Sequence, residues 1–142
     1  MTRNYKFIDH TADIALMLEG DTLHELFIAG FEAWLASVAE INDYNSGDHL
    51  KVEISASSKE QLLVSFLNEL NFHLITKKWL CLNVDSIKIN ESSEEFNLVA
   101  DLKGIKVDND FELKEEIKSV TYHQMEIIKK KNIYSTLVVF DI

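Results

Sequence analysis

Apolar and polar residues alternate along most of the second half of the chain, and this pattern restricts the fold more than any other feature. The stretches with a period of two are residues 80–89, 96–102, 120–127 and 134–142. Because successive side chains of a strand point to opposite faces, each stretch predicts a β-strand with one buried face. The period slips near Asp85-Ser86 and near His123-Gln124, where we expect a bulge or a bend.

The first half of the chain contains two helical patterns. Apolar residues recur every three or four positions over residues 22–41 and again over residues 59–76, which predicts two amphipathic helices. Each pattern begins with a capping box, a hydroxyl residue followed three positions later by Glu or Gln. The two boxes are Thr22 with Glu25 and Ser58 with Gln61.

Short apolar stretches over residues 5–8, 14–19 and 50–55 predict three further strands. The expected element order is therefore ββαβαββββ. Consecutive strands joined by short turns are antiparallel neighbours. We therefore expect one domain over residues 1–142 of the α+β class, a two-layer sandwich in which two helices cover one face of a mainly antiparallel sheet.

The charge balance and the cysteine content narrow the partners and the compartment. Fourteen Lys and Arg residues against 24 Asp and Glu give a formal net charge of −10. Nucleic-acid binding needs a basic surface, so we expect no direct sequence-specific contact with nucleic acid. Cys81 is the only cysteine, which suits a reducing compartment. Residues 1–6 lack the apolar region of a signal peptide, and no apolar run is long enough for a membrane span, so we expect a cytoplasmic protein without a membrane partner.

Polar groups are concentrated at residues 7–14, between two predicted strands. Asp9, His10, Thr11 and Asp13 fall within five positions there. Groups this dense at a strand junction must be solvated, paired or bound to an ion. Either aspartate alone fits an ordinary turn equally well, because aspartate hydrogen-bonds its own backbone in turns.

The last two residues add oxygen ligands. Asp141 carries a carboxylate, and Ile142 is expected to carry the terminal carboxylate. If the fold brings both ends together, an anionic cage results whose like charges a divalent cation would relieve. An all-oxygen ligand set favours Ca²⁺ or Mg²⁺ over Zn²⁺. A ligand from His10 or His123 would shift the preference toward a transition metal.

The sequence contains no signature of conventional catalysis. It lacks a glycine-rich phosphate loop, a nucleophile elbow and a His-Glu-x-x-His pair. We therefore expect a protein that is not an enzyme.

Several segments, in this order and spacing, closely resemble the archease family over essentially the whole chain. They are Phe7-Ile8-Asp9-His10-Thr11-Ala12-Asp13-Ile14, Thr22-Leu23-x-Glu25-Leu26-Phe27, Phe66-Leu67-Asn68-Glu69-Leu70, Lys118-Ser119-Val120-Thr121-Tyr122-His123 and Val138-Val139-Phe140-Asp141-Ile142. The resemblance implies an accessory protein of the RtcB-type RNA ligase, which joins tRNA exon halves. Archeases promote guanylylation of the active-site histidine of that ligase and allow multiple turnover.

The resemblance also implies a bound divalent cation, with Ca²⁺ as the first expectation and Mg²⁺ as the second. Its ligands here would be Asp13, Asp141 and an oxygen of Ile142. Asp9, His10 and His123 would orient those ligands or touch the ligase.

Two other classes of function stay open. One is a general chaperone or adaptor for RNA-modifying enzymes, in which the ion is structural. The other is a stand-alone metal-dependent phosphoesterase that uses the same cage, although the site lacks an obvious general base.

Overall fold

A computed structural model describes residues 2–8, 13–41, 47–92, 94–121 and 126–142. The elements follow the chain in the order β1 (Arg3–Ile8), β2 (Asp13–Gly20), α1 (Leu23–Val38), β3 (Asp48–Ala56), α2 (Lys59–Ile75), β4 (Trp79–Glu91), β5 (Phe96–Lys106), β6 (Ser119–Thr121), β7 (Ile128–Lys130) and β8 (Ile133–Asp141). The α+β class and the two helices are confirmed. Of the strand expected over residues 120–127, residues 120–121 lie in β6, residues 126–127 precede β7 without belonging to a strand, and residues 122–125 lie outside the described part of the chain.

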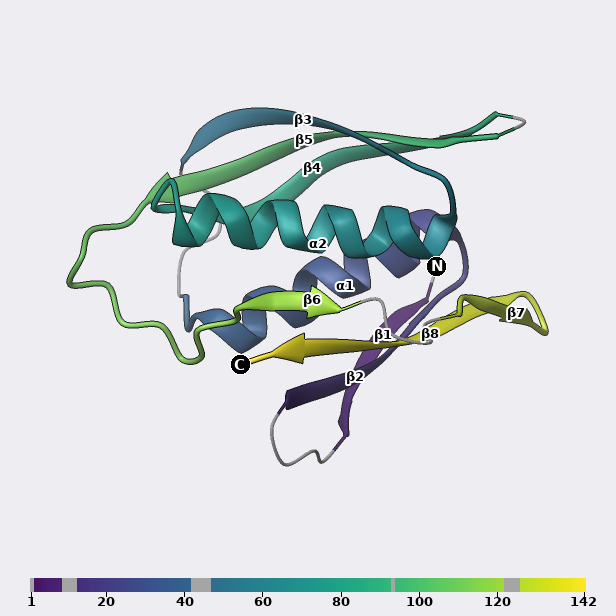
Figure 1. Cartoon of the computed structure of the whole chain (residues 1–142), viewed down its shortest axis with the longest axis horizontal. Helices are drawn as coiled ribbons and strands as arrows, with labels where there is room; N and C mark the ends of the chain where they lie inside the picture. The colour runs from purple at the N-terminus through teal and green to yellow at the C-terminus, as the bar shows by residue number, and fades with distance from the viewer. Residues whose placement is uncertain (1, 9–12, 42–46, 93, 122–125) are drawn as a thin grey trace.

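The strands form two sheets with the helices between them (Figure 1). The larger sheet has the order β1-β2-β8-β6, and β7 also pairs with β8; the smaller sheet has the order β3-β5-β4. All of these pairs are antiparallel, as expected. Helix α1 contacts β1 and β2 as well as β4, and α2 contacts the smaller sheet as well as β6. The expectation of one sheet covered on one face by both helices is therefore corrected: the helices form a middle layer.

Helix α1 shows why a second sheet can pack on the helices. Its predicted apolar face, which includes Trp34, is buried. Its other side carries Ile28, Ala29, Ala33 and Ser37, whose exposed fractions are only 8%, 0%, 0% and 5%. Small side chains let a sheet approach the helix closely, so α1 is enclosed nearly all round.

Both predicted helix caps are present. The Thr22 hydroxyl accepts a hydrogen bond from the Glu25 amide at 3.0 Å, and the Ser58 hydroxyl accepts one from the Gln61 amide at 3.1 Å. The Glu25 carboxylate, expected to reach back to the Thr22 amide, is buried and accepts a bond from Arg3 Nη1 at 2.8 Å. This pair ties β1 to the start of α1, and the hydrogen bond to Glu25 raises the pKa of Arg3.

A buried polar chain links the two helices to the segment before β6. Trp34 Nε1 donates to Asn71 Oδ1 at 3.1 Å, and Asn71 Nδ2 donates to the Ile117 carbonyl at 2.6 Å. Among the described residues, every buried side-chain nitrogen and oxygen has a hydrogen-bond partner. These two hydrogen bonds fix the direction in which residues 117–121 enter the larger sheet.

One of the two predicted irregularities can be checked. The pairing of β4 with β5 shifts between Val84 and Ser86, which confirms the slip at Asp85-Ser86, and shifts again between Cys81 and Asn83. The slip at His123-Gln124 lies outside the described residues. On either side of it, Thr121 pairs with Val139 and Ile128 pairs with Ser135.

Candidate functional site

A row of polar residues crosses three strands at one end of the larger sheet. Asp13 of β2 pairs with Asp141 of β8, and Asp141 pairs on its other side with Ser119 of β6. Directly opposite residues share a face of the sheet, with Cβ atoms about 4.5–5.5 Å apart. Ser119 Oγ donates to Asp141 Oδ2 at 3.1 Å. We call Asp13, Asp141 and Ser119 the acidic row.

The neighbouring buried residues set the register of this row. Phe140 is 1% exposed and pairs with Ile14 of β2 and Val120 of β6. These residues face the helices, so the acidic row, one position along, projects from the opposite, outer face. A slip of β8 by one residue would expose Phe140 and bury Asp141, which strongly disfavours any other register.

Helix α2 holds the short edge strand β6 in place. Asn68 Nδ2 donates to the Val120 carbonyl at 2.9 Å, and the Val120 amide donates to Asn68 Oδ1 at 2.8 Å. One side chain thereby satisfies backbone groups that an edge strand otherwise leaves unpaired. On the other side of β6, the Lys118 amide donates to the Asp141 carbonyl at 2.8 Å. Ser119 therefore lies between two anchored neighbours.

The structure brings together two of the six residues predicted for the site. Asp13 and Asp141 are cross-strand partners. Ile142 directly follows the last residue of β8 and is 38% exposed, so it lies at the same end of that strand. The other three, Asp9, His10 and His123, lie outside the described residues.

Two residues that complete the site were not predicted. Ser119 and Asn68 both occur in the segments that resemble the archease family, but neither had been given a role. Their roles depend on β6 pairing with β8 and on α2 lying beside β6. The periodicity of the sequence indicates neither contact.

The donor atoms at the acidic row fit a hard divalent cation. Two carboxylates, a hydroxyl and nearby main-chain carbonyls are all oxygen donors, the type that Ca²⁺ and Mg²⁺ prefer. Among the described residues, no group of three or more His, Cys, Asp and Glu side chains converges. A complete shell of about six to eight oxygens would therefore also need the hydroxyl, main-chain or water oxygens.

Cys81 does not form part of a reactive site. It is fully buried in β4, and burial raises the pKa of its thiol to about 12. Its Sγ donates to the Asn83 carbonyl at 3.4 Å. Nucleophilic attack and metal ligation both require the thiolate, which this environment suppresses.

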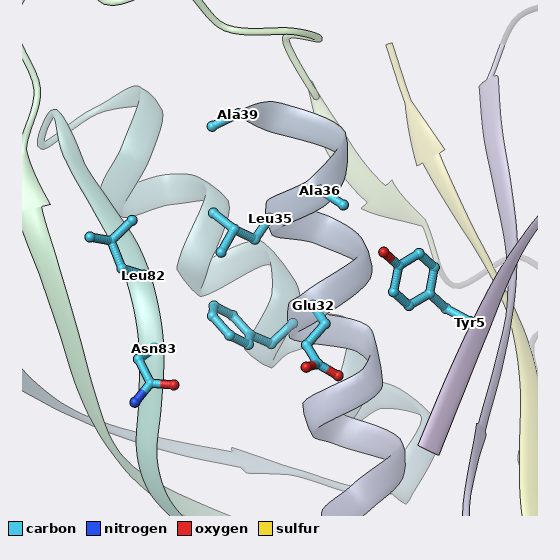
Figure 2. Close-up of a pocket in the computed structure, with 8 residues that line it drawn as sticks. Tyr5, Glu32, Leu35, Ala36, Ala39, Leu82 and Asn83 are labelled. Carbon is cyan, nitrogen blue, oxygen red and sulfur yellow. The ribbon is translucent and has the colours of Figure 1, made fainter. Parts of the chain in front are cut away.

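An open groove lies elsewhere on the molecule, over α1 between β4 and β1. It encloses about 450 Å³, and Figure 2 shows Leu82 and Asn83 of β4 on one side of α1 and Tyr5 of β1 on the other. Its one charged lining residue is Glu32, whose carboxylate accepts a bond from Arg3 Nε at 3.0 Å. Among the described residues that line the groove, only Tyr5 and Glu32 are titratable, and the Glu32 carboxylate already has Arg3 as its partner.

Comparison with known proteins identifies the family. A model of the Archease protein family (MTH1598/TM1083) matches residues 5–142. The chain belongs to the archease family. A "Protein archease" from Pyrococcus abyssi is 33% identical over 129 residues, which are 89% of each chain. Another from Methanothermobacter thermautotrophicus is 25% identical over 140 residues, 99% of each chain.

Two solved structures share the archease fold seen here. The solution structure of Methanobacterium thermoautotrophicum protein 1598 has a TM-score of 0.75 and 26% identity, and covers 97% of this chain and 98% of that one. A crystal structure from Thermotoga maritima, described as an archease and possible chaperone, has a TM-score of 0.63 and 23% identity over 96% of each chain. The arrangement of two antiparallel sheets and two helices is thus that of archeases.

Neither described helix is both long enough and apolar enough to cross a membrane.

Proposed function

We propose that this archease is a non-catalytic, divalent-cation-binding activator of an RtcB-type tRNA-splicing RNA ligase. In this role it promotes guanylylation of the ligase and allows multiple turnover. Membership of the archease family and the acidic row both support the proposal. The observation that carries it is the cross-strand pairing of Asp13 with Asp141, since two carboxylates held side by side on a rigid sheet are suited to a cation.

The residues at this end of the larger sheet would have different roles in binding the cation. Asp13, Asp141 and a main-chain oxygen of Ile142 would hold the cation, Ca²⁺ first and Mg²⁺ second. When bound, the cation supplies positive charge for contact with phosphate or carboxylate groups. Ser119 would fix the orientation of Asp141 by donating to its carboxylate. Asp9, His10 and His123 stay candidates for orienting ligands or touching the ligase.

The ligase contact would act by positioning. The acidic, cation-loaded end of the larger sheet would enter the ligase active site, where positive groups bind the nucleotide. There it would help metal ion and nucleotide reach the geometry in which the ligase histidine attacks the α-phosphate of GTP. We expect this to occur in the cytoplasm and without direct sequence-specific contact with nucleic acid.

A guanylylation assay with an RtcB-type ligase from the same organism tests the proposal. Asp13→Asn and Asp141→Asn should lose stimulation while keeping the native circular dichroism spectrum. The matched control is Asp101→Asn in β5, because Asp101 also accepts from a serine, Ser86, on an outer sheet face. Full stimulation by the folded Asp13→Asn and Asp141→Asn variants would contradict the proposal.

A general chaperone or adaptor is the second candidate, because the Thermotoga maritima protein is described as a possible chaperone. In that case the cation is structural. Chelation would lower the melting temperature, and the two Asp→Asn variants would stay active once assayed below their own melting temperatures. The same two variants therefore separate this candidate from the ligase activator.

A further inference from the structure

The outer face of the larger sheet carries apolar side chains. The register places Met17 beside Leu137 on this face, with Val139 one row along on one side and Ile128 and Ile133 on the other. Lys6 and Glu19 also lie on this face, and Ala15, beside Val139, is only 4% exposed. Leu137 is 42% exposed, Ile128 50% and Ile133 38%. We call Met17, Ile128, Ile133, Leu137 and Val139 the apolar face. Figure 1 shows both helices on the opposite side of the sheet, so neither helix covers it.

The fold does not require such a face. An antiparallel sheet with one side on the core normally presents polar residues on the other. The smaller sheet follows this rule: its outer rows are Lys51-Asp101-Ser86, Glu53-Val99-Lys88 and Ser55-Asn97-Asn90. Contiguous apolar residues on an exposed surface commonly mark a site of interaction.

The apolar face has charges of opposite sign at its two ends. The acidic row lies at one end, next to the pair of Ala15 and Val139. At the other end, Lys130 pairs with Ile133, and the hairpin between β7 and β8 turns through Lys131 and Asn132, which have φ values of 52° and 63°. From Ile133 to Asp141 the strand spans about 26 Å. A partner must therefore offer cation-binding or positive groups at one end and acidic groups at the other.

The size of the face favours a transient partner. Four neighbouring strands of this length would cover about 500 Å², and the larger sheet offers less, because β1, β6 and β7 are shorter than β8. A stable interface buries about 800 Å² on each partner, so this face alone is too small for a stable dimer of the chain. An activator that serves many turnovers must leave its partner, which suits a small interface.

We propose that the apolar face docks on the RtcB-type ligase beside the ligase active site. This inference rests on the proposed function. A ligase surface that receives the acidic row must also approach Val139 in the adjacent row, since the two rows are successive on the same face. Leu137 then packs near the centre of the contact, where apolar side chains contribute most to affinity. Lys130 and Lys131 meet acidic groups of the ligase at the far end.

The binding test compares equivalent positions of the two sheets. Leu137→Glu should weaken binding to the ligase at least about tenfold in isothermal titration calorimetry. The control Val99→Glu makes the same kind of change on the outer face of the smaller sheet and should stay within about twofold of wild type. Lys130→Glu should weaken binding by about threefold at low salt, and this effect should vanish at high salt because exposed charges are screened.

Each outcome has one meaning. Leu137→Glu should bind Ca²⁺ and unfold on heating as the wild type does, which shows that the acidic row and the fold are intact in that variant. If Leu137→Glu then binds the ligase as tightly as wild type, the docking proposal is wrong even where the wild type activates the ligase. If Asp13→Asn still stimulates the ligase while Leu137→Glu does not bind, the ion-based function is wrong and the docking face stands.

If wild type does not bind the ligase, both proposals fail. A wild-type dimer that Leu137→Glu dissociates in sedimentation would show that a second copy covers the face, which also overturns the docking proposal.

Discussion

Each of the two sheets carries a serine–aspartate pair on its outer face. The third residue of that row is Lys51 in the smaller sheet and Asp13 in the larger sheet, so its charge differs in sign. In the smaller sheet, Ser86 Oγ donates to Asp101 Oδ2 at 2.8 Å, and Asp101 pairs on its other side with Lys51. The acidic row of the larger sheet repeats this arrangement across three strands, but Asp13 takes the place that Lys51 has in the smaller sheet.

This difference shows how each sheet deals with a surface carboxylate. The row with Lys51 contains its own positive charge, and cross-strand pairs of opposite charge are favourable by about 0.2–1 kcal/mol. The acidic row places a second carboxylate in that position. Like charges directly opposite each other are destabilising, and a bound cation would relieve that repulsion. The row in the smaller sheet thus contains charges of both signs, whereas the acidic row is the one to which we assign a cation in the proposed function.

Exchanging the charge in the acidic row tests the comparison most severely. For wild type, Ca²⁺ at about 100 times its dissociation constant should raise the free energy of unfolding by about 2.7 kcal/mol. Asp13→Lys should abolish this rise, because it recreates the Lys–Asp–Ser row of the smaller sheet. Without Ca²⁺ the variant should be more stable than wild type by up to about 1 kcal/mol. Urea unfolding with and without Ca²⁺, followed by circular dichroism, measures both quantities.

The reciprocal variant is the control for that experiment. Lys51→Asp should lower the Ca²⁺-free stability by up to about 1 kcal/mol and leave the stabilisation by Ca²⁺ unchanged. If Asp13→Lys keeps the full Ca²⁺ effect, the acidic row does not bind the ion.

Removing the two hydrogen bonds between Asn68 and Val120 of β6, which we call the clamp, should have the next largest effect. Asn68→Ala leaves the amide and carbonyl of Val120 without their partner, and should lower the free energy of unfolding by about 1–3 kcal/mol. It should also weaken Ca²⁺ binding, because Ser119 is no longer held in place. Calorimetric titration with Ca²⁺ and urea unfolding check the two effects.

The smaller sheet offers a matched asparagine. Asn97 accepts a bond from Ser55 at 2.6 Å on an exposed face, so Asn97→Ala should change stability by no more than about 0.5 kcal/mol and leave Ca²⁺ affinity unchanged. Equal effects of the two Asn→Ala variants on Ca²⁺ affinity would show that the clamp is not specific to the site.

A smaller effect tests how tightly the smaller sheet packs on the helices. Burial raises the pKa of Cys81 from its ordinary value of 9.0 to about 12. The neutral thiol therefore contributes fully below pH 9, and this contribution is lost as the pH rises from 9 toward 12, because the unfolded chain ionises first. Between pH 8 and pH 10 the wild type should lose about 1.4 kcal/mol more than Cys81→Ala in urea unfolding. Equal losses would mean that water reaches the thiol in the native protein.

Local features of the fold were predictable from the sequence. Thr22 and Ser58 begin the helices because a hydroxyl cap is a short-range signal. The slip at Asp85-Ser86 was visible because a bulge breaks the period of two. The division into two sheets was not predictable from periodicity, since Ala29 and Ala33 on the second side of α1 give only a weak apolar signal.

The candidate site was only partly predictable, because most of its contacts join segments that are far apart in the sequence. Asp13 and Asp141 stood out as acidic residues at opposite ends of the sequence, and the pairing of β2 with β8 makes them neighbours. Whether they bind an ion stays a prediction. Ser119 and Asn68 were missed because their contacts join segments that are distant in the sequence. Only a strand register or a helix–strand contact assigns such residues.

The position of β8 in the larger sheet has a consequence for biosynthesis. The last strand of the sequence lies between β2 and β6, two strands made before it. Strands β3, β5 and β4 occupy one continuous stretch of chain with α2, so the smaller sheet has all its strands earlier during translation. The acidic row can assemble only after Asp141 leaves the ribosome, so the cation binding proposed for it would have to wait until synthesis has passed that point.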